Sequence, residues 1–330
     1  MGYSIEALSE SNVHRWEEFN NRSPEGTLFH SIRWKNILED TLNLRLRYYL
    51  IFEDQRVIGI CPFIEQSTSV FRGLASIPYS EFTNIILEKQ FDPGHFNKIL
   101  SLFAEENAFL HITTYDSNLI DRIQHDSFIL ENTGNMMLDL KQRPPEAIWS
   151  TFSRNMRYNI QIFNKKEFQI REARQHADVE SFYRYYADNM AHIQGEVLPF
   201  SFFQRLRDLF PSTELRIAIL ANDDVTAGGS LAILDPARRV AYYEYLALNR
   251  DLPNQYTPTY PIYWDLVNWA QDSGCEKLSF GRQNLDPGNP RFQGKIKFGA
   301  EYAPISSRFV ALSKTVSLLY RLRRMLPKRT

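Results

Sequence analysis

The sequence predicts a mixed α/β (α+β) fold with two tandem lobes, each a twisted mixed sheet flanked by helices. Its 330 residues are enough for two domains. The second half repeats the first, with two helices followed by a hairpin in the same order and spacing. In this alignment Val57 corresponds to Val225, and Ser31 corresponds closely to Ser201. The proline-rich, basic residues 141–145 mark the join between the lobes.

The first lobe is predicted over residues 1–142. Apolar residues at helical spacing predict two short helices, the second of which Ser31 can cap. Residues 48–52 and 57–64 are rich in β-formers and flank a polar turn, which predicts a hairpin. A helix is expected from about Pro93, and strands at 111–114 and 136–140 complete the lobe.

The second lobe is predicted over residues 143–311, and 312–330 form a basic C-terminal tail. Apolar residues from Trp149 to Phe163 recur every three or four positions, which predicts one long, basic amphipathic helix at the entrance of the lobe. A strand at 239–248 should alternate, with Tyr243 and Tyr245 on one face and Glu244 on the other. A helix over 262–271 leads to a strand at 277–280.

Charge is segregated along the chain, although the net charge is only −1. Residues 141–174, 277–297 and 312–330 are basic, and the segments 1–140 and 175–276 are acidic. Short basic segments beside an acidic body predict a local anion site, and the alternative is that they are solvated faces. The basic, apolar-interleaved tail suggests contact with anionic lipid or RNA, or else a frayed terminus.

Composition narrows the class of protein further. Two distant cysteines do not make a disulfide framework, which favours a reducing compartment. No signal peptide or membrane span is evident, so we expect a cytoplasmic protein, in peripheral contact with the inner membrane face if the tail binds lipid. The histidines and cysteines lack metal-ligand spacing, so no metal is predicted, and no phosphate-binding loop occurs.

Residues 278–300, LSFGRQNLDPGNPRFQGKIKFGA, combine an apolar strand, a break at Gly281-Arg282 and a polar loop with fixed cations. A scaffold commonly presents chemistry in this way, and the alternative is a surface loop whose glycines supply positive φ. This stretch resembles the motif Asp-Phe-Gly-Arg-Ser, a Gly-rich loop, then Phe-Lys-x-x-Trp-Gly-Ala of the FemAB family. The chain is therefore similar to tandem proteins of the GNAT (acyl-CoA N-acyltransferase) superfamily, with a BioF2-like acetyltransferase domain.

Three further motifs carry the resemblance, which covers nearly the whole chain. Residues 76–82 are similar to the family's Ser-Leu-Pro-Tyr-x-Asp-Tyr/Phe-Gly-Gly, and residues 154–160 to its basic Leu-Arg-x-Asn-Ile-Arg helix. Residues 192–195, His-Ile-Gln-Gly, form the last match. The sequence departs from the family at Ser279, which replaces the acidic residue, at Thr83-Asn84, which replace two glycines, and at Phe298, which replaces tryptophan.

The resemblance implies transfer of an acyl or aminoacyl group onto an amine of a cell-envelope (peptidoglycan) or exopolysaccharide-linked acceptor. The resemblance implies no tightly bound cofactor. The expected donor is aminoacyl-tRNA or acyl-CoA, and the expected acceptor is a small-molecule, glycan or peptide precursor. DNA is not an expected partner. Residues 254–260 lack the usual coenzyme A loop pattern. Two alternatives are an acyl-CoA-dependent N-acetyltransferase with an atypical loop, and a catalytically silent double lobe that only binds a precursor.

Acyl transfer to an amine needs an aligned carbonyl, a neutral amine and stabilisation of the oxyanion. Lys295 is the first candidate, either to stabilise the developing charge or to grip a donor phosphate; the alternative is a solvated surface lysine. Arg282 suits a bidentate clamp on a carboxylate or phosphate, or a structural ion pair.

Carboxylates and a basic helix supply the other candidates. Glu81 is a candidate to position the amine or take its proton, and Glu244 is a weaker candidate for the same role. The alternative for both is a purely structural role. Arg154 and Arg157 lie on one side of a helix and suit an anionic donor or acceptor, or a solvated face. Four further residues are expected to bind substrate: Tyr79, His192, Tyr243 and Phe298.

Overall fold

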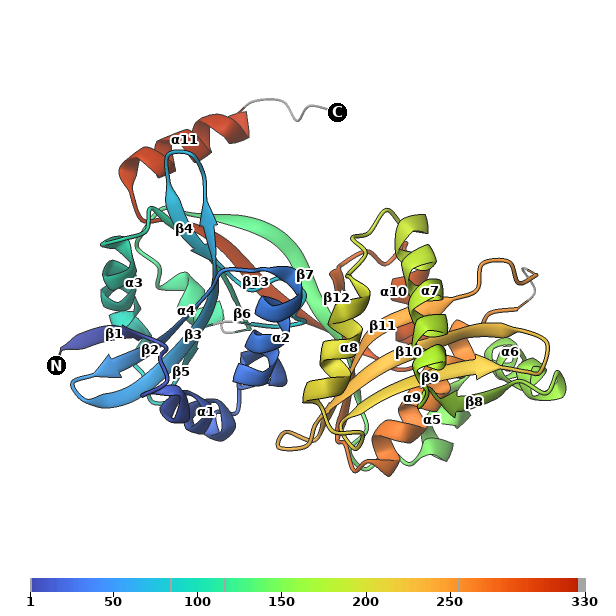
Figure 1. Cartoon of the computed structure of the whole chain (residues 1–330). Coiled ribbons are helices and arrows are strands. Elements are labelled where there is room, and N and C mark those ends of the chain that lie inside the picture. The colour runs from blue at the N-terminus through green and yellow to red at the C-terminus, as the bar shows by residue number, and fades with distance from the viewer. Residues whose placement is uncertain (1, 84, 116, 254–255, 326–330) are drawn as a thin grey trace. The chain divides into compact units, whose positions relative to one another are not determined.

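The computed structural model describes residues 2–83, 85–115, 117–253 and 256–325. The chain divides into two compact units, each a mixed sheet with helices (Figure 1). Unit 1 comprises residues 1–134 and 304–330, and unit 2 comprises residues 135–303. Both the mixed α/β class and the tandem arrangement of lobes are thereby confirmed.

Unit 1 has the strand order β1-β2-β3-β4-β6-β13, with β5 paired to β3. Its strands are β1 (Tyr3–Ala7), β2 (Leu46–Glu53), β3 (Arg56–Ser67), β4 (Arg72–Ala75), β5 (Ile86–Leu87), β6 (Phe109–Thr114) and residues 304–311 of β13 (Glu301–Ala311). Its helices are α1 (Val13–Arg22), α2 (Ile32–Leu42), α3 (Phe96–Ala104), α4 (Ser117–Asp121), α11 (Lys314–Met325) and the short 3-10 helices η1 (Leu28–His30) and η2 (Pro93–His95). Ser31 caps α2 as predicted, because its hydroxyl accepts a hydrogen bond from the Trp34 amide at 3.2 Å.

Unit 2 has the strand order β7-β12-β11-β10-β9-β8. Its strands are residues 135–139 of β7 (Ser127–Asp139), then β8 (Gln169–Glu172), β9 (Leu215–Ala221), β10 (Thr226–Asp235), β11 (Val240–Leu248) and β12 (Lys277–Asn284). Its helices are α5 (Pro145–Thr151), α6 (Arg154–Lys165), α7 (His176–His192), α8 (Phe200–Leu209), α9 (Thr259–Asp272) and α10 (Pro290–Lys297).

The two units share one topology. In each, antiparallel strands lead to a parallel pair, β4 with β6 in unit 1 and β11 with β12 in unit 2. β13 follows unit 2 in the chain but pairs with β6 of unit 1, and β7 begins in unit 1 but lies next to β12 in the strand order. Each unit therefore receives its last strand from a segment that also belongs to the other unit, and the boundaries fall at 134/135 and 303/304 rather than at 142/143 and 311/312.

The predicted long helix at the entrance of the second lobe is wrong, because two helices occupy that stretch. α5 ends at Thr151 and α6 begins at Arg154. Ser153 between them has extended backbone, with φ −61° and ψ 156°, and its hydroxyl accepts a hydrogen bond from the Met156 amide. An N-cap residue cannot also continue the preceding helix. Both helices still bury the predicted apolar face.

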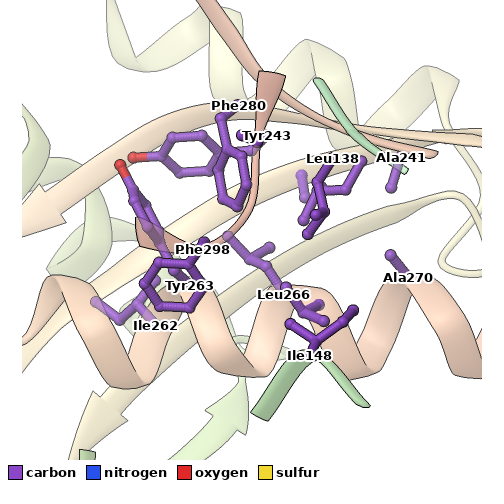
Figure 2. Close-up of a cluster of buried hydrophobic side chains, with 14 of the residues drawn as sticks. Leu138, Ile148, Ala241, Tyr243, Ile262, Tyr263, Leu266, Ala270, Phe280 and Phe298 are labelled. Atoms are coloured by element: carbon purple, nitrogen blue, oxygen red, sulfur yellow. The ribbon is translucent and has the colours of Figure 1, made fainter. Parts of the chain in front are cut away.

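Helices cover both faces of the unit 2 sheet. A β-carbon at Gly228 of β10 would meet Ile262 of α9, and one at Gly229 would meet Phe182 of α7. Neighbouring residues of a strand point to opposite faces, so α9 and α7 lie on opposite sides of the sheet. The core under α9 includes Leu266, Phe280 and Phe298, all fully or almost fully buried (Figure 2).

Candidate functional site: a basic cavity where two strands diverge

The parallel pair of unit 2 comes apart partway along its length. β11 and β12 are paired at Val240 with Lys277, Ala241 with Leu278 and Tyr242 with Ser279, and both strands continue without further pairing to each other. A β-bulge follows at once, since Tyr243 is opposite Ala232 and Tyr245 is opposite Leu231, which leaves Glu244 as the extra residue. The strand ends thus separate and expose backbone and side chains between them.

A cavity of about 710 Å³ opens beside these strand ends. Five of the predicted site residues line it: His192, Tyr243, Glu244, Arg282 and Lys295. They come from α7, β11, β12 and α10, so tertiary structure collects them from four elements. The lining also includes Tyr186, Tyr245, Tyr260 and Tyr263, which give the cavity aromatic walls.

The bulge at Glu244 changes the faces predicted for β11. Tyr243 packs against Tyr263 of α9, with ring centroids 5.4 Å apart. Tyr245 packs instead against Tyr186 of α7 and Phe203 of α8, at 5.3 and 5.5 Å. The prediction that Tyr243 and Tyr245 share a face is wrong, because one extra residue reverses the alternation.

Lys295 is a buried cation at the point of divergence. It is 8% exposed, and its Nζ donates a hydrogen bond to the backbone carbonyl of Phe280, one residue beyond the last pair of the ladder. Asn289 caps α10, because its side chain accepts a hydrogen bond from the Arg291 amide at 2.9 Å, and Pro290 begins the helix. The predicted alternative of a solvated surface lysine does not hold.

Two glycines shape this segment. Gly281, with φ 82°, turns β12 immediately after Phe280, and Gly299, with φ 86°, follows α10. Ser279 is fully buried, and its hydroxyl accepts a hydrogen bond from the Gly281 amide at 3.2 Å. The serine that replaces the family's acidic residue therefore supports the turn on which Arg282 is placed.

Positive charge predominates around the cavity. Among the described lining residues Arg250, Arg282, Arg291 and Lys295 are basic, and only Glu244 and Asp286 are acidic. Arg250 donates a hydrogen bond to the neutral Asn189 side chain, and burial together with the nearby charge of Arg291 lowers its pKa. In the part of the chain that the structure describes, neither Arg250 nor Arg291 forms an ion pair with a carboxylate. Sequence reasoning missed both arginines, and each lies in a loop or at a helix start with no motif to mark it.

The floor of the cavity contains two buried tyrosine hydroxyls. Tyr243 and Tyr263 are hydrogen-bonded through their side chains, and their hydroxyls point toward one another (Figure 2). Burial raises the pKa of Tyr243 well above its usual range and that of Tyr263 to about 12. Both are therefore neutral hydrogen-bonding groups at physiological pH.

Three predicted substrate-binding residues lie away from the cavity. Phe298 is fully buried in the core, 4.9 Å from the Phe152 ring and 5.5 Å from that of Tyr263, so it has no surface with which to touch a substrate. Arg154 and Arg157 lie on α6 and line no part of the cavity. For Phe298 the sequence motif marked a packing residue.

Tyr79 and Glu81 belong to unit 1, in the loop that follows β4. Tyr79 has φ 56°, a conformation uncommon for a residue other than glycine, and Glu81 is buried at 7% exposure. Trp34 fixes the loop through an indole hydrogen bond to Ser80 at 2.8 Å. Their roles in binding and proton transfer stay predictions.

Other predicted features fall partly outside the described residues. Asn84, Asn254 and Gln255 and the last five residues of the tail are among these. Among the described residues no helix is long and apolar enough to cross a membrane, and no cluster of three His, Cys, Asp or Glu side chains suits a metal ion.

Residues 150–293 match the family model of the acetyltransferase (GNAT) domain. The whole fold is similar to the crystal structure of FemX, with a TM-score of 0.68 and 11% identity over 97% of this chain and 99% of that one. It is also similar to a tandem GNAT protein from the clavulanic acid biosynthesis pathway (TM-score 0.58, 10% identity, 94% and 98% covered). A third similar structure is the C-terminal domain of a putative lysylphosphatidylglycerol synthetase from Agrobacterium fabrum (0.57, 11%, 96% of each chain). A search of curated proteins found no match. The matched stretch contains the divergent strands and most of the cavity, and the two-unit fold of the chain is similar to that of FemX and of the tandem GNAT protein.

Proposed function

We propose that the unit 2 cavity transfers an acyl or aminoacyl group onto a primary amine of an anionic, cell-envelope or polysaccharide-linked precursor. The observation that carries this proposal is the excess of positive charge at the point where β11 and β12 diverge. Arginine guanidinium groups suit phosphate and carboxylate, so an anionic substrate would compensate Arg250 and Arg291.

In the proposed reaction the amine attacks the donor carbonyl, a C–N bond forms, and the C–S or C–O bond to the leaving group breaks. Lys295 stabilises the oxyanion of the tetrahedral intermediate, since its buried ammonium group lies beside the separated strand ends. Glu244, at the bulge in the cavity wall, accepts the proton that the amine loses. The leaving thiolate or alkoxide receives the proton that Glu244 has accepted, and the neutral hydroxyl of Tyr263 stabilises it by donating a hydrogen bond.

We propose acyl-CoA as the donor, because the family match is to an acetyltransferase domain. Thr257, Thr259 and Tyr260, at the start of α9, line the same cavity, so the amino end of a 14-residue helix faces the ligand space. A helix amino end favours phosphate. Aminoacyl-tRNA is the second candidate donor, and a silent precursor-binding protein is the third reading.

Ligand-binding measurements distinguish the acyl-CoA donor, the aminoacyl-tRNA donor and the silent precursor-binding protein. We expect CoA thioesters to raise the melting temperature of the full chain, and we expect this shift to shrink in the Arg250→Ala/Arg291→Ala variant. If only aminoacyl-tRNA raises the melting temperature, and the effect disappears steeply as the salt concentration rises, aminoacyl-tRNA replaces acyl-CoA as the proposed donor. A shift with UDP-linked or peptide precursors but no transfer from any donor would establish the silent protein.

Lys295→Met tests the catalytic assignment, since methionine keeps the apolar stem and removes the charge. Removing one donor to an oxyanion typically slows the chemical step by about 100- to 1000-fold. Lys297→Met, an exposed cation on the same helix, is the matched control and should transfer at the wild-type rate. Transfer assays paired with thermal melting decide the outcome, and a folded Lys295→Met protein with full activity would remove Lys295 from the mechanism.

A further inference from the structure

Helix α11 carries an apolar stripe that no described part of unit 1 covers. Leu318, Leu319 and Leu322 are 59%, 48% and 50% exposed. Val316 and Ser317, on the same helix, are buried at 5% and 6%. At 100° per residue the three leucines lie within one 100° sector of the helix, on the side opposite Val316 and Tyr320.

Specific contacts fix the orientation of this helix on unit 1. The Tyr320 ring stacks on Phe309 of β13, with centroids 4.3 Å apart and an interplanar angle of 12°, and lies 4.6 Å from Phe128. Ser317 donates a hydrogen bond to the Asp126 carboxylate, and Arg321 binds the same carboxylate at 2.6 Å. Because these contacts hold the opposite side of the helix, the leucine stripe is directed outward.

The stripe has basic edges and no acidic residue. Lys314 and Arg321 flank it on one side and Arg323 on the other, and α11 contains no Asp or Glu. Asp126 compensates Arg321, whereas in the described chain Lys314 and Arg323 have no ion-pair partner. The sequence adds Lys328 and Arg329 after the helix.

The turn between β3 and β4 extends this surface. Phe71 packs into the small cluster of Phe109, Ala311 and Val316 that lies beneath α11, and the hairpin reaches the helix in unit 1 (Figure 1). Its neighbour Val70 is 75% exposed at the tip of the turn. An exposed apolar side chain from another element therefore accompanies the three leucines of the stripe.

We propose that α11 is a membrane-surface helix, which lies in the headgroup region of an anionic bilayer with Leu318, Leu319 and Leu322 toward the acyl chains. A basic amphipathic helix with an apolar face of this kind binds such an interface by apolar burial and attraction to anionic lipid together. A protein partner is the weaker match. Three half-exposed leucines supply far less area than the roughly 1,200 Å² that a stable protein interface buries, and the centre of such an interface is usually poor in charge.

Vesicle cosedimentation of the full chain tests this proposal. We expect binding to vesicles of phosphatidylcholine with about 30% phosphatidylglycerol, and weak binding to phosphatidylcholine alone. Leu318→Ser/Leu322→Ser should lower the partition coefficient at least tenfold, since burying one leucine is worth more than a factor of ten. Arg323→Glu should weaken binding to the anionic vesicles and reduce its salt dependence. Tyr158→Ser, which removes an exposed aromatic residue in unit 2, is the matched control and should bind like wild type.

Leu322→Cys carrying an environment-sensitive fluorophore gives an independent readout, because the native Cys61 and Cys275 are buried. We expect a blue shift on addition of anionic vesicles. Equal binding of the leucine variant and wild type, with melting curves unchanged, would overturn the proposal. So would oligomers that the leucine substitutions dissociate, or binding of tRNA through Arg323 by a chain that ignores vesicles. Because this surface belongs to unit 1, each result is independent of transfer activity in unit 2.

Discussion

The hydroxyls of Tyr243 and Tyr263 show how one residue's environment sets its chemistry. Both lie under the cavity, and both are buried at about 6–7% exposure. Burial disfavours the phenolate, so the pKa of each rises, and the shared hydrogen bond orients the two groups. A neutral hydroxyl at the cavity floor is suited to donate a hydrogen bond, and unsuited to act as a base.

The raised pKa of Tyr263 predicts how stability depends on pH. Between about pH 10, the usual tyrosine value, and about pH 12, the tyrosine of the unfolded chain is ionised while folded Tyr263 keeps its proton. The unfolded state then binds fewer protons than the folded state. The stability that protonated Tyr263 contributes is therefore complete below pH 10 and is lost as the pH rises to 12. Tyr263→Phe should flatten the fall in unfolding free energy by up to about 1.4 kcal/mol per pH unit. Urea unfolding of wild type and variant at pH 9 to 12 measures this difference. Unfolding free energies that fall equally steeply with pH in both proteins would contradict a raised pKa for Tyr263.

The strand β10 shows how close packing shapes an element. Gly228 and Gly229 lie in its first half, where a β-carbon would come within 2.5 Å of the Ala247 carbonyl oxygen and 2.4 Å of that of Ala218. Both obstacles are backbone atoms, which cannot move like a flexible side chain. The requirement for glycine here is one of space between neighbouring strands.

Gly228→Ala should therefore displace β10 from β11 and lower stability. Overpacking of this kind costs about 1–3 kcal/mol. Gly294→Ala is the matched control, because a β-carbon at Gly294 in α10 would meet nothing within 4 Å, and it should stabilise the helix by about 0.5–1 kcal/mol. Chemical unfolding separates the two substitutions. A Gly228→Ala protein as stable as wild type would show that the strands can separate freely.

At the scale of the whole molecule, unit 1 depends on a strand that arrives from the other end of the chain. Ser306 to Ala311 of β13 pair with Phe109 to Thr114 of β6, which lie almost 200 positions earlier in the sequence. α11 then packs on unit 1 through Tyr320 and Asp126. The described residues 304–325 are thus structural members of unit 1.

A chain truncated after Ala303 should lose the order of unit 1 and keep that of unit 2. Removal of β13 exposes the edge of β6 and uncovers Phe109, so β4 and β6 should exchange amide hydrogen rapidly. Strands β9 to β12 keep their neighbours and should stay protected. Hydrogen exchange with mass spectrometry resolves the two regions. Uniform loss of protection, or none, would contradict the division into units.

The sequence by itself determined the mixed α/β class, the duplicated helices and hairpins, and the segment that carries Gly281, Arg282 and Lys295. These follow from local periodicity, turn residues and motif, which act over a few neighbouring positions. A one-residue bulge at Glu244 and the break at Ser153 leave the apolar pattern almost unchanged, so neither could be predicted from it. Only the tertiary structure decided that Phe298 packs in the core, that Arg250 and Arg291 meet at the cavity, and that β13 returns to unit 1. These features depend on pairings between distant segments, which no local pattern records.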